Sequence, residues 1–361
     1  MNLSVSRKRN VQYSVTNRVS LMLAIVPLWL MIAAAVPATG QTSSATSSPA
    51  DWTQFLRDNM QRWNPYETIL GVNNVGSLQL KWSYTIENNA QVSNSSSPAV
   101  VNGVVYLGSS DHNVYALNAG TGAKLWSFAT GDRVFSSPAV ANGVVFVGST
   151  DSSLYALNAS TGAKLWSYAT GAGVVFSPAV ANGVVYFDSA DHNVYALNAS
   201  TGAKLWSYAT PSSPDCSPAV ANGIVYIDNG YGTVIALDAN TGAELWSFNT
   251  DGDFLEGSFA VANGVVYACT DNTALYALNA STGAKLWSYS NGAGCYSAPA
   301  VANGVVYFLD GNVNALNAST GVKLWSSPGG DYHSSPAVAN GVVLCQLGRQ
   351  CFVCPERQHR R

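Results

Sequence analysis

The chain has 361 residues, of which 47% are hydrophobic and only 10% charged, so it can bury a large core but has few charges for its surface. Residues 49–348 hold nine Lys and Arg against 19 Asp and Glu, and this net charge of −10 argues against nucleic acid as a partner. The 18 Tyr and 10 Trp favour a turn-rich all-β fold over a helical one.

Residues 1–48 have the pattern of a targeting segment. Four basic residues between positions 7 and 18 precede the apolar run "LMLAIVPLWLMIAAAV", and a Ser/Thr-rich linker follows it. This order predicts a signal peptide cleaved after Ala38 or Gly40. The alternative is an uncleaved N-terminal anchor, although the apolar run is shorter than the roughly 20 residues of a typical spanning helix. We therefore expect an exported protein, periplasmic, extracellular or on the cell surface, with no membrane contact beyond such an anchor.

Residues 49–96 form a lead-in segment that ends in "LQLKWSYTI", around Trp82. This stretch is a single copy of a strand that closes every later repeat. In a ring of repeats, we expect it to complete the last one as its fourth strand and so to join the two ends of the chain.

Residues 97–344 repeat a unit of about 40 residues, of which "SPAVANGVVFVGSTDSSLYALNASTGAKLWSYATG" is one copy. Each unit predicts four short strands, "PAVAN", "GVVYVGS", "LYALNA" and "KLWSYAT", and its Asn-Gly dipeptide is typical of a tight hairpin turn. Four-stranded meanders at this period are blades of a β-propeller. We predict seven recognisable blades, the last one incomplete. The units begin at Pro98, Pro138, Pro178, Pro218, Phe259, Pro299 and Pro336.

Residues 345–361 lose the repeat pattern and contain Cys351, Cys354 and His359. A Cys-x2-Cys pair with a nearby His has the spacing of a zinc site. However, a back-translation of "CPERQHRR" read one base later gives Ala-Leu-Asn-Ala-Ser-Thr-Gly, the motif that the unit lacks. We therefore interpret the tail as the product of a frameshift near residue 344, with zinc as the alternative. An undisturbed frame could supply an eighth blade.

The motif "ALNASTGAKLW" (residues 156–166) resembles the tryptophan-docking motif of the pyrroloquinoline quinone (PQQ) propeller family. The resemblance implies that each Trp packs on a Gly of a neighbouring motif, where the missing side chain lets the aromatic ring approach. The implied structural Trp residues are Trp126, Trp166, Trp206, Trp246, Trp287 and Trp325. The implied Gly residues are Gly122, Gly162, Gly202, Gly242, Gly283 and Gly321.

The lead-in stretch "DWTQFLRDNMQRWNPYETILGVNNVGSLQLKWSY" is similar to the segment that precedes the propeller of quinoprotein dehydrogenases. That family implies PQQ, calcium and an Asp base acting on an alcohol or sugar. Its alcohol-oxidising members carry a disulfide between adjacent cysteines, whereas Cys216, Cys269 and Cys295 are isolated in this sequence. No residue here aligns with the family's calcium ligands, and no catalytic insertion interrupts the units. We therefore assign no catalytic residue and no firm cofactor, while PQQ and calcium stay open.

The same repeats also build propellers without catalysis, including one in the outer-membrane β-barrel assembly machinery. Fold alone does not separate these functions. The sequence favours an exported module that binds a protein or a small molecule. The alternative is a quinoprotein dehydrogenase or its degenerate remnant. The oligomeric state is not indicated by the sequence.

The linkers between units vary most, and in propellers they gather on one face around the axis. They supply the candidate ligand-binding residues Asp132, Arg133, Asp215, Asp251, Asp253, Glu256, Asp331 and His333. The linker "TDGDFLEG" places three carboxylates in six positions, which suits calcium. Because its spacing matches no known calcium loop, we interpret it as a solvated acidic turn and keep Asp251, Asp253 and Glu256 as weak calcium candidates. His333 near Asp331 could act as a base, but a surface His is the simpler interpretation.

A second set of acids lies in the turns between the second and third strands. An Asp at such a turn ordinarily accepts backbone N–H groups, so we interpret this set as structural. Its members are Asp111, Asp151, Asp191 and Asp271.

Overall fold

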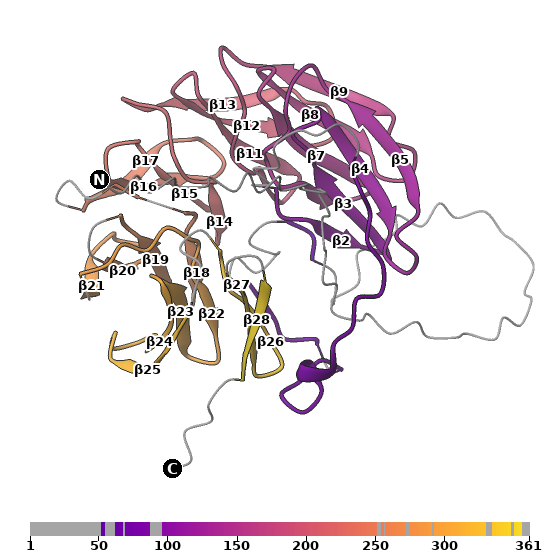
Figure 1. The fold of residues 1–361 in the computed structure, drawn as a ribbon. Helices are drawn as coiled ribbons and strands as arrows, with labels where there is room; N and C mark the ends of the chain where they lie inside the picture. Colours follow the sequence, from indigo (N-terminus) through magenta and orange to yellow (C-terminus); the bar gives the residue numbers. More distant parts are fainter. Residues whose placement is uncertain are drawn as a thin grey trace, which may run out of the picture.

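The computed structural model describes residues 52–54, 62–67, 69–86, 96–250, 254–255, 257–271, 274–290, 292–329, 334–347 and 350–355. These residues form seven four-stranded sheets arranged as a ring, which confirms the predicted all-β propeller (Figure 1). The one helical element among them is the short 3-10 turn η1 (Val75–Ser77). No helix in the described ranges is long and apolar enough to span a bilayer.

Each of the first six blades comes from one repeat and runs outward from the axis. Blade 1 contains β2 (Ala99–Val101), β3 (Val104–Gly108), β4 (Asn113–Asn118) and β5 (Lys124–Ala129). Blade 2 contains β6 (Ala139–Ala141), β7 (Val144–Ser149), β8 (Ser153–Asn158) and β9 (Lys164–Ala169). Blade 3 contains β10 (Ala179–Ala181), β11 (Val184–Ser189), β12 (Asn193–Asn198) and β13 (Lys204–Ala209).

Blades 4 to 6 repeat the same order. Blade 4 contains β14 (Ala219–Ala221), β15 (Ile224–Asp228), β16 (Thr233–Asp238) and β17 (Glu244–Asn249). Blade 5 contains β18 (Ala260–Ala262), β19 (Val265–Cys269), β20 (Ala274–Asn279) and β21 (Lys285–Ser290). Blade 6 contains β22 (Ala300–Ala302), β23 (Val305–Leu309), β24 (Asn312–Asn317) and β25 (Lys323–Pro328).

The Asn-Gly dipeptides form the innermost hairpins, as predicted. Asn142 and Gly143 have φ values of 50° and 76°, which a two-residue hairpin turn of this kind requires. The turn makes Ala141 and Val144 a closing pair in the β6–β7 ladder. Every unit shares this register, so equivalent residues point in the same direction in all blades.

Tryptophan and glycine join each blade to the next. A Cβ built on Gly162 would lie 2.7 Å from Cε3 of Trp126, so only glycine leaves room for the indole. The indole Nε1 donates a hydrogen bond to the carbonyl of Ala159 (2.9 Å), and Tyr106 lies against the indole in a tilted arrangement, with 5.9 Å between ring centroids. Burial of these rings between sheets therefore stabilises each junction.

Residues 78–86, expected as a fourth strand, form no named strand among the described residues, although Tyr84 lies in a β-bridge, so this expectation stays a prediction for blade 7. The sheet of blade 7 contains β26 (Ala337–Ala339), β27 (Val342–Leu347), β28 (Gln350–Pro355) and β1 (Trp63–Asn64). β1 pairs in parallel with β26 at the inner edge, where backbone N–H and C=O groups face the axis. Trp82 nevertheless lies against Gly122 of blade 1, and its Nε1 donates to the carbonyl of Ala119 (2.9 Å). The lead-in segment thus contacts blade 1 through a side chain, while another part of it adds a strand to the inner edge of blade 7.

Candidate functional site

The variable linkers and the turns between second and third strands lie at the same end of the blades, which we call the linker face. The turn acids hold the linkers in place. Asp151 accepts the N–H of Gly131 (2.7 Å) and the hydroxyl of Tyr155 (2.7 Å), and Asp191 accepts the N–H of Gly171. Asp271 accepts the N–H of Phe254 in the same way. These bonds confirm the structural interpretation of the turn acids.

The structure places three of the predicted ligand-binding residues on this face. Asp132 lies 3.6 Å from Nε2 of His112, and the N–H of Arg133 bonds its carboxylate and lowers the pKa of Asp132. The carbonyl of Arg133 accepts the N–H of Thr150, so this stretch is fixed to blade 2. Asp215 lies in the linker that enters blade 4, and partial burial raises its pKa. The two sites are in different linkers and do not form one cluster.

The other five predicted residues lie outside the described residues, so their placement stays a prediction. They are Asp251, Asp253, Glu256, Asp331 and His333.

Two buried carboxylates on strands were missed by the sequence reasoning. Asp228 ends β15 and accepts the N–H groups of Asp215 (3.0 Å) and Gly230 (3.0 Å), and burial raises its pKa to about 7. Asp188 on β11 is only 2% exposed, and its Oδ1 has no hydrogen-bond partner. Burial first, and then repulsion by Asp228 and Asp215, raises the pKa of Asp188 well above its usual range.

The repeat register explains why these acids are unusual. Their position near the end of the second strand is occupied by Gly108 in blade 1 and Gly148 in blade 2. A Cβ on Gly148 would lie 2.3 Å from the side chain of Val174, in the linker that enters the following blade. The strand-end position therefore faces a fixed position of the next linker. Asp188 and Asp228 therefore each place a carboxylate at this junction. An alignment of the repeats shows the change from Gly to Asp, so the sequence does contain a signal for these buried acids.

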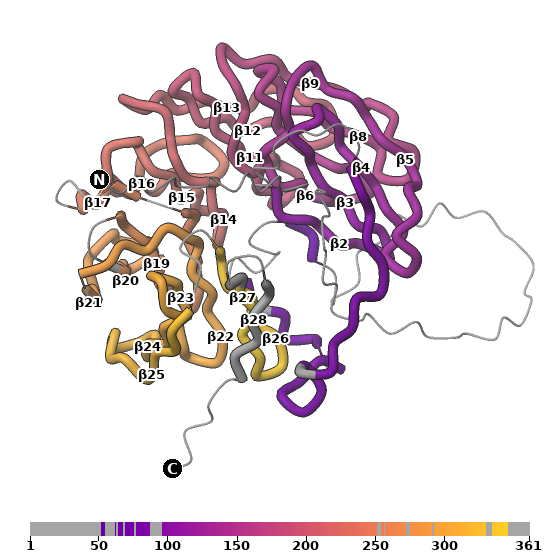
Figure 2. The backbone as a smooth tube through the Cα atoms, viewed as in Figure 1, coloured from indigo at the N-terminus to yellow at the C-terminus, as the bar shows by residue number. Residues whose placement is uncertain are grey.

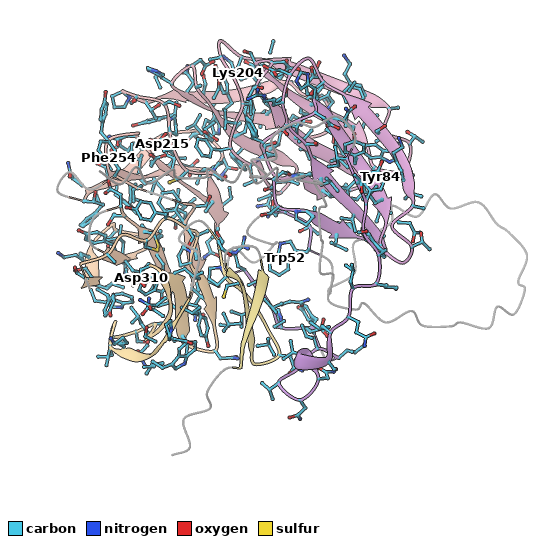
Figure 3. The ribbon with its side chains drawn as sticks, in the orientation of Figure 1. Trp52, Tyr84, Lys204, Asp215, Phe254 and Asp310 are labelled. Carbon is cyan, nitrogen blue, oxygen red and sulfur yellow. A yellow bond between two sulfur atoms is a disulfide. The ribbon has the colours of Figure 1, made fainter. Side chains whose placement is uncertain are left out.

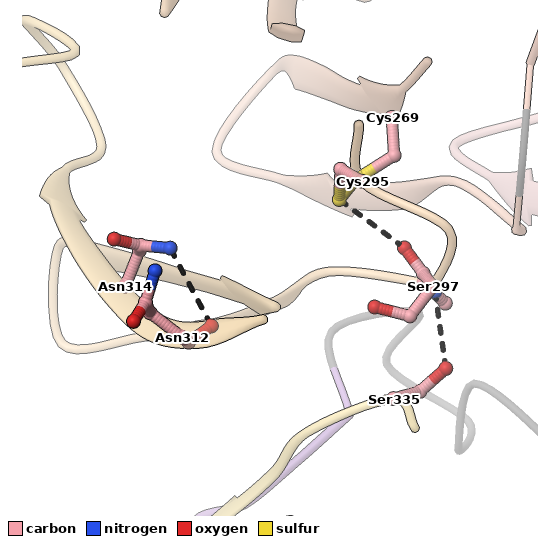
Figure 4. Close-up of a disulfide and its surroundings, with 7 residues drawn as sticks. Cys269, Cys295, Ser297, Asn312, Asn314 and Ser335 are labelled. Atoms are coloured by element: carbon pink, nitrogen blue, oxygen red, sulfur yellow. Dashed lines mark hydrogen bonds between the residues drawn. A yellow bond between two sulfur atoms is a disulfide. The ribbon is translucent and has the colours of Figure 1, made fainter. Parts of the chain in front are cut away.

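The same register reveals a disulfide that the sequence analysis did not predict. Cys269 holds the strand-end position of blade 5, and Cys295 holds the facing position of the next linker. The two are bonded, with their Cα atoms 5.2 Å apart (Figure 4). The two cysteines are isolated in the sequence, and the junction between two blades closes the 26 residues that separate them.

Two exposed aromatic residues accompany the acids of blade 4. Tyr231 is 57% exposed and holds the turn position that Asp111, Asp151 and Asp191 occupy in blades 1 to 3. Phe254 is 45% exposed in the next linker, where Leu255 bridges to Thr270. In this blade, Asp228 accepts the N–H groups of the linker, so no Asp is needed at the turn position and Tyr231 can occupy it. Asp215 and Phe254 lie on the side of the ring formed by blades 4 and 5 (Figure 3).

The chain's own lead-in segment occupies part of the ring axis, where Trp52 lies (Figure 3). The guanidinium of Arg62 stands 5.9 Å from the Trp52 ring centroid, and its Nε donates to the carbonyl of Pro336 (2.7 Å). Burial lowers the pKa of Arg62 to about 10, so it remains charged at neutral pH. These contacts fix the lead-in segment to blade 7.

The described residues do not provide a calcium site. Within the described ranges, no three acidic, histidine or cysteine side chains converge on one point. Both oxygens of Asp228, the most buried carboxylate of the linker face, accept backbone N–H groups. This carboxylate therefore serves to hold the linker. The donor set in this part of the chain therefore does not fit calcium, and we derive no chemistry through it.

Comparison with known proteins fits this architecture. Two family profiles match: one described as outer membrane protein assembly factor BamB, over residues 110–233 and 230–353, and one described as the β-propeller domain of glucose/ethanol/alcohol dehydrogenases, over residues 52–136. The chain belongs to the PQQ-like β-propeller family.

Sequence relatives of this PQQ-like propeller are quinoprotein dehydrogenases. The dehydrogenase subunit of the quinone alcohol dehydrogenase of Gluconobacter oxydans is 36% identical over 109 residues, 27% of this chain and 14% of that protein. The quinoprotein ethanol dehydrogenase of Pseudomonas putida is 29% identical over 125 residues, 30% of this chain and 20% of that protein. The chain thus matches at most about a fifth of the length of these two relatives.

Solved structures share the fold at low identity. BamB from Moraxella catarrhalis aligns with a TM-score of 0.63 at 19% identity, over 75% of this chain and 88% of that one. The quinohemoprotein alcohol dehydrogenase ADHIIG from Pseudomonas putida HK5 aligns with a TM-score of 0.71 at 18% identity, over 85% of this chain and 71% of that one. At such identities the likeness is one of fold.

Proposed function

We propose that the protein is an exported binding module that takes a protein or small-molecule ligand on its linker face. The observation that carries the proposal is the blade 4 junction. There Tyr231, in the turn of blade 4, and Phe254, in the linker that follows, expose aromatic surface at positions where the otherwise near-identical units differ. Exposed aromatic side chains on loops that a rigid scaffold holds are typical of binding surfaces.

Export is supported by two features of the chain. The N-terminal order of basic residues and an apolar run is that of a targeting segment. The Cys269–Cys295 disulfide is of a kind that persists in oxidising compartments outside the cytosol. The acidic body favours a ligand with cationic groups.

A direct test compares the wild type with a Tyr231→Ser/Phe254→Ser double variant. The immobilised proteins are exposed to the exported protein fraction of the source cells, and bound proteins are identified by mass spectrometry. We expect the wild type to retain a defined protein that the double variant loses. A Leu125→Ser variant, which removes an equally exposed side chain from the outer edge of blade 1, is the matched control and should retain it. Equal capture by all three proteins would contradict the proposal.

The second candidate is a quinoprotein dehydrogenase or its remnant, which the matches to the Gluconobacter and Pseudomonas enzymes favour. Titration with PQQ and Ca²⁺, followed by dye reduction with ethanol or glucose, separates the two candidates. We expect no saturable change in the quinone absorbance and no dye reduction. A saturable change with turnover would establish the second candidate instead.

A further inference from the structure

The turn between the third and fourth strands carries a motif that the proposed function leaves unused. In four blades this turn begins with Asn-Ala-Ser, and Asn-x-Ser with any x except Pro is the acceptor sequence for N-linked glycosylation in exported proteins. The four acceptors are Asn158, Asn198, Asn279 and Asn317. They belong to blades 2, 3, 5 and 6, whose third and fourth strands are spread around the ring (Figure 2).

The structure holds the four Asn side chains in one conformation. Oδ1 of Asn158 accepts the N–H groups of Ser160 (3.0 Å) and Thr161 (3.0 Å), so the side chain closes an Asx-turn over the acceptor sequence. The equivalent bonds from the Ser of the other three turns are also 3.0 Å long. Because Oδ1 faces the turn, Nδ2 lies on the other branch of the planar amide and is directed away from these N–H groups.

These turns lie at the ends of the blades opposite to the linker face. The N–H of Ala159 donates to the carbonyl of Gly143 (2.9 Å), which places the turn beside the Asn-Gly hairpin of its own blade. Ser160 is exposed and Asn158 is half-buried, and the other three turns show the same pattern. A group attached to these Asn residues would therefore leave the linkers uncovered.

The hydrogen bonds of the turn do not require the acceptor sequence. Blade 1 has Gly120 in place of the Ser, and its N–H donates to Oδ1 of Asn118 in the same way (2.9 Å). Blade 4 has Asp238 in place of the Asn, and its carboxylate accepts the N–H of Asn240 (3.0 Å). Either half of the motif can thus be replaced without loss of these bonds, yet four turns keep both halves.

We propose that Asn158, Asn198, Asn279 and Asn317 are N-glycosylation sites, so that the exported protein carries sugar chains on the face opposite to its linkers. The donor is an oligosaccharide linked through a diphosphate to a membrane lipid, and a transferase of the exporting membrane catalyses the transfer. Glycosylation goes beyond the proposed function and shares with it only the export of the chain.

The transfer makes one bond and breaks one. Nδ2 of the Asn forms a bond to C1 of the first sugar, while the bond between C1 and the diphosphate oxygen breaks. The lipid diphosphate leaves with that electron pair, and Nδ2 gives up one proton to a base of the transferase. The N–H groups bonded to Oδ1 favour this loss, because they withdraw electron density from the amide.

Peptide mapping by mass spectrometry of the protein exported by the source cells is the first test. We expect a glycan at each of the four acceptors and none at Asn118. Fragmentation must locate the modified residue, because Asn94, in the same tryptic peptide as Asn118, also begins an Asn-x-Ser sequence. Unmodified masses at all four acceptors would overturn the proposal.

Variants made in the same cells test whether the motif itself directs the modification. Ser160→Ala keeps the N–H that Oδ1 accepts and should lose the glycan at Asn158 alone. Thr161→Ala, just outside the acceptor sequence, is the matched control and should keep it. Gly120→Ser completes the sequence in blade 1 and should add a glycan at Asn118.

A glycan at Asn158 that survives Ser160→Ala, or an unmodified Asn118 in the folded Gly120→Ser protein, would contradict the assignment. Circular dichroism checks that the variants are folded. The proposed function would not fail with the assignment, because its own test changes Tyr231 and Phe254 on the linker face.

Discussion

At the scale of single residues, the glycines of the repeat meet two different requirements: a left-handed backbone conformation, and a close contact with the Trp of a neighbouring blade. Gly143 and Gly162 both have positive φ, near 75°. A Cβ on Gly143 would meet nothing within 4 Å, whereas one on Gly162 would meet Trp126 at 2.7 Å. The first glycine therefore serves the backbone alone, and the second serves the backbone and the contact between blades.

This difference predicts unequal costs for the same substitution. Gly143→Ala should lower the free energy of unfolding by about 1–2 kcal/mol, the cost of a left-handed alanine. Gly162→Ala should cost roughly 1–3 kcal/mol more, because the methyl group displaces the indole. Urea denaturation of the two variants measures the difference directly. Equal losses would show that the Trp–Gly contact contributes little.

The buried acids make stability depend on pH in an unusual direction. An Asp whose folded pKa is raised binds its proton more tightly in the native state, so its contribution to stability is full below about pH 4 and is lost as pH rises. For Asp228 the loss continues to about pH 7, the folded pKa. Asp188, buried without a partner for Oδ1, acts in the same sense.

Asp188→Asn should therefore stabilise the protein more at pH 8 than at pH 4. The gain follows from the raised pKa of Asp188, because the native state must hold a buried, charged carboxylate once the pH exceeds that pKa. The measurement is the free energy of unfolding of both proteins at both pH values. Asp238→Asn is the control with opposite sign, since hydrogen bonds from Thr241 lower the pKa of Asp238. A pH-independent effect of Asp188→Asn would contradict the assignment.

At the scale of elements, the repeat made the four strands of a blade predictable from the sequence, because hairpin turns and strand patterns are local. The partners across a junction were less accessible. Cys269 and Cys295 meet only because the strand-end position of one blade faces a linker position of the next, and this pairing became visible from the Gly148–Val174 contact. The place of β1 beside β26 was missed for the same reason: nothing local in "WN" indicates a parallel partner 275 residues away.

The disulfide should stabilise the junction of blades 5 and 6. Removing it by a Cys269→Ala/Cys295→Ala double substitution is expected to lower the free energy of unfolding by about 2–4 kcal/mol. Dithiothreitol should lower the stability of the wild type by a similar amount and leave the double variant unchanged. Hydrogen exchange should rise first in β19 and β22, the strands on either side of the bond. A wild type that is insensitive to the reductant while the disulfide is shown to be reduced would refute this role.

At the scale of the whole molecule, the ring is held by a series of similar junctions, and its closure depends on the lead-in segment. Trp82 provides to Gly122 of blade 1 what Trp126 provides to Gly162 of blade 2. The segment thus contributes to the ring twice, once through the contact of Trp82 with blade 1 and once as the strand β1 at the inner edge of blade 7.

Closure through Trp82 predicts that its removal costs as much as removal of a Trp inside the ring. Trp82→Ala and Trp166→Ala should each lower the free energy of unfolding by about 3–5 kcal/mol. Trp82→Phe keeps an aromatic ring but loses the second ring of the indole and the bond to the Ala119 carbonyl, so it should cost less than Trp82→Ala, about 1–3 kcal/mol. Hydrogen exchange separates local from global effects, because opening the ring at this junction should expose β2–β5 of blade 1 before the central blades. If Trp82→Ala left stability unchanged while Trp166→Ala reduced it, the ends of the ring would be joined by β1 alone.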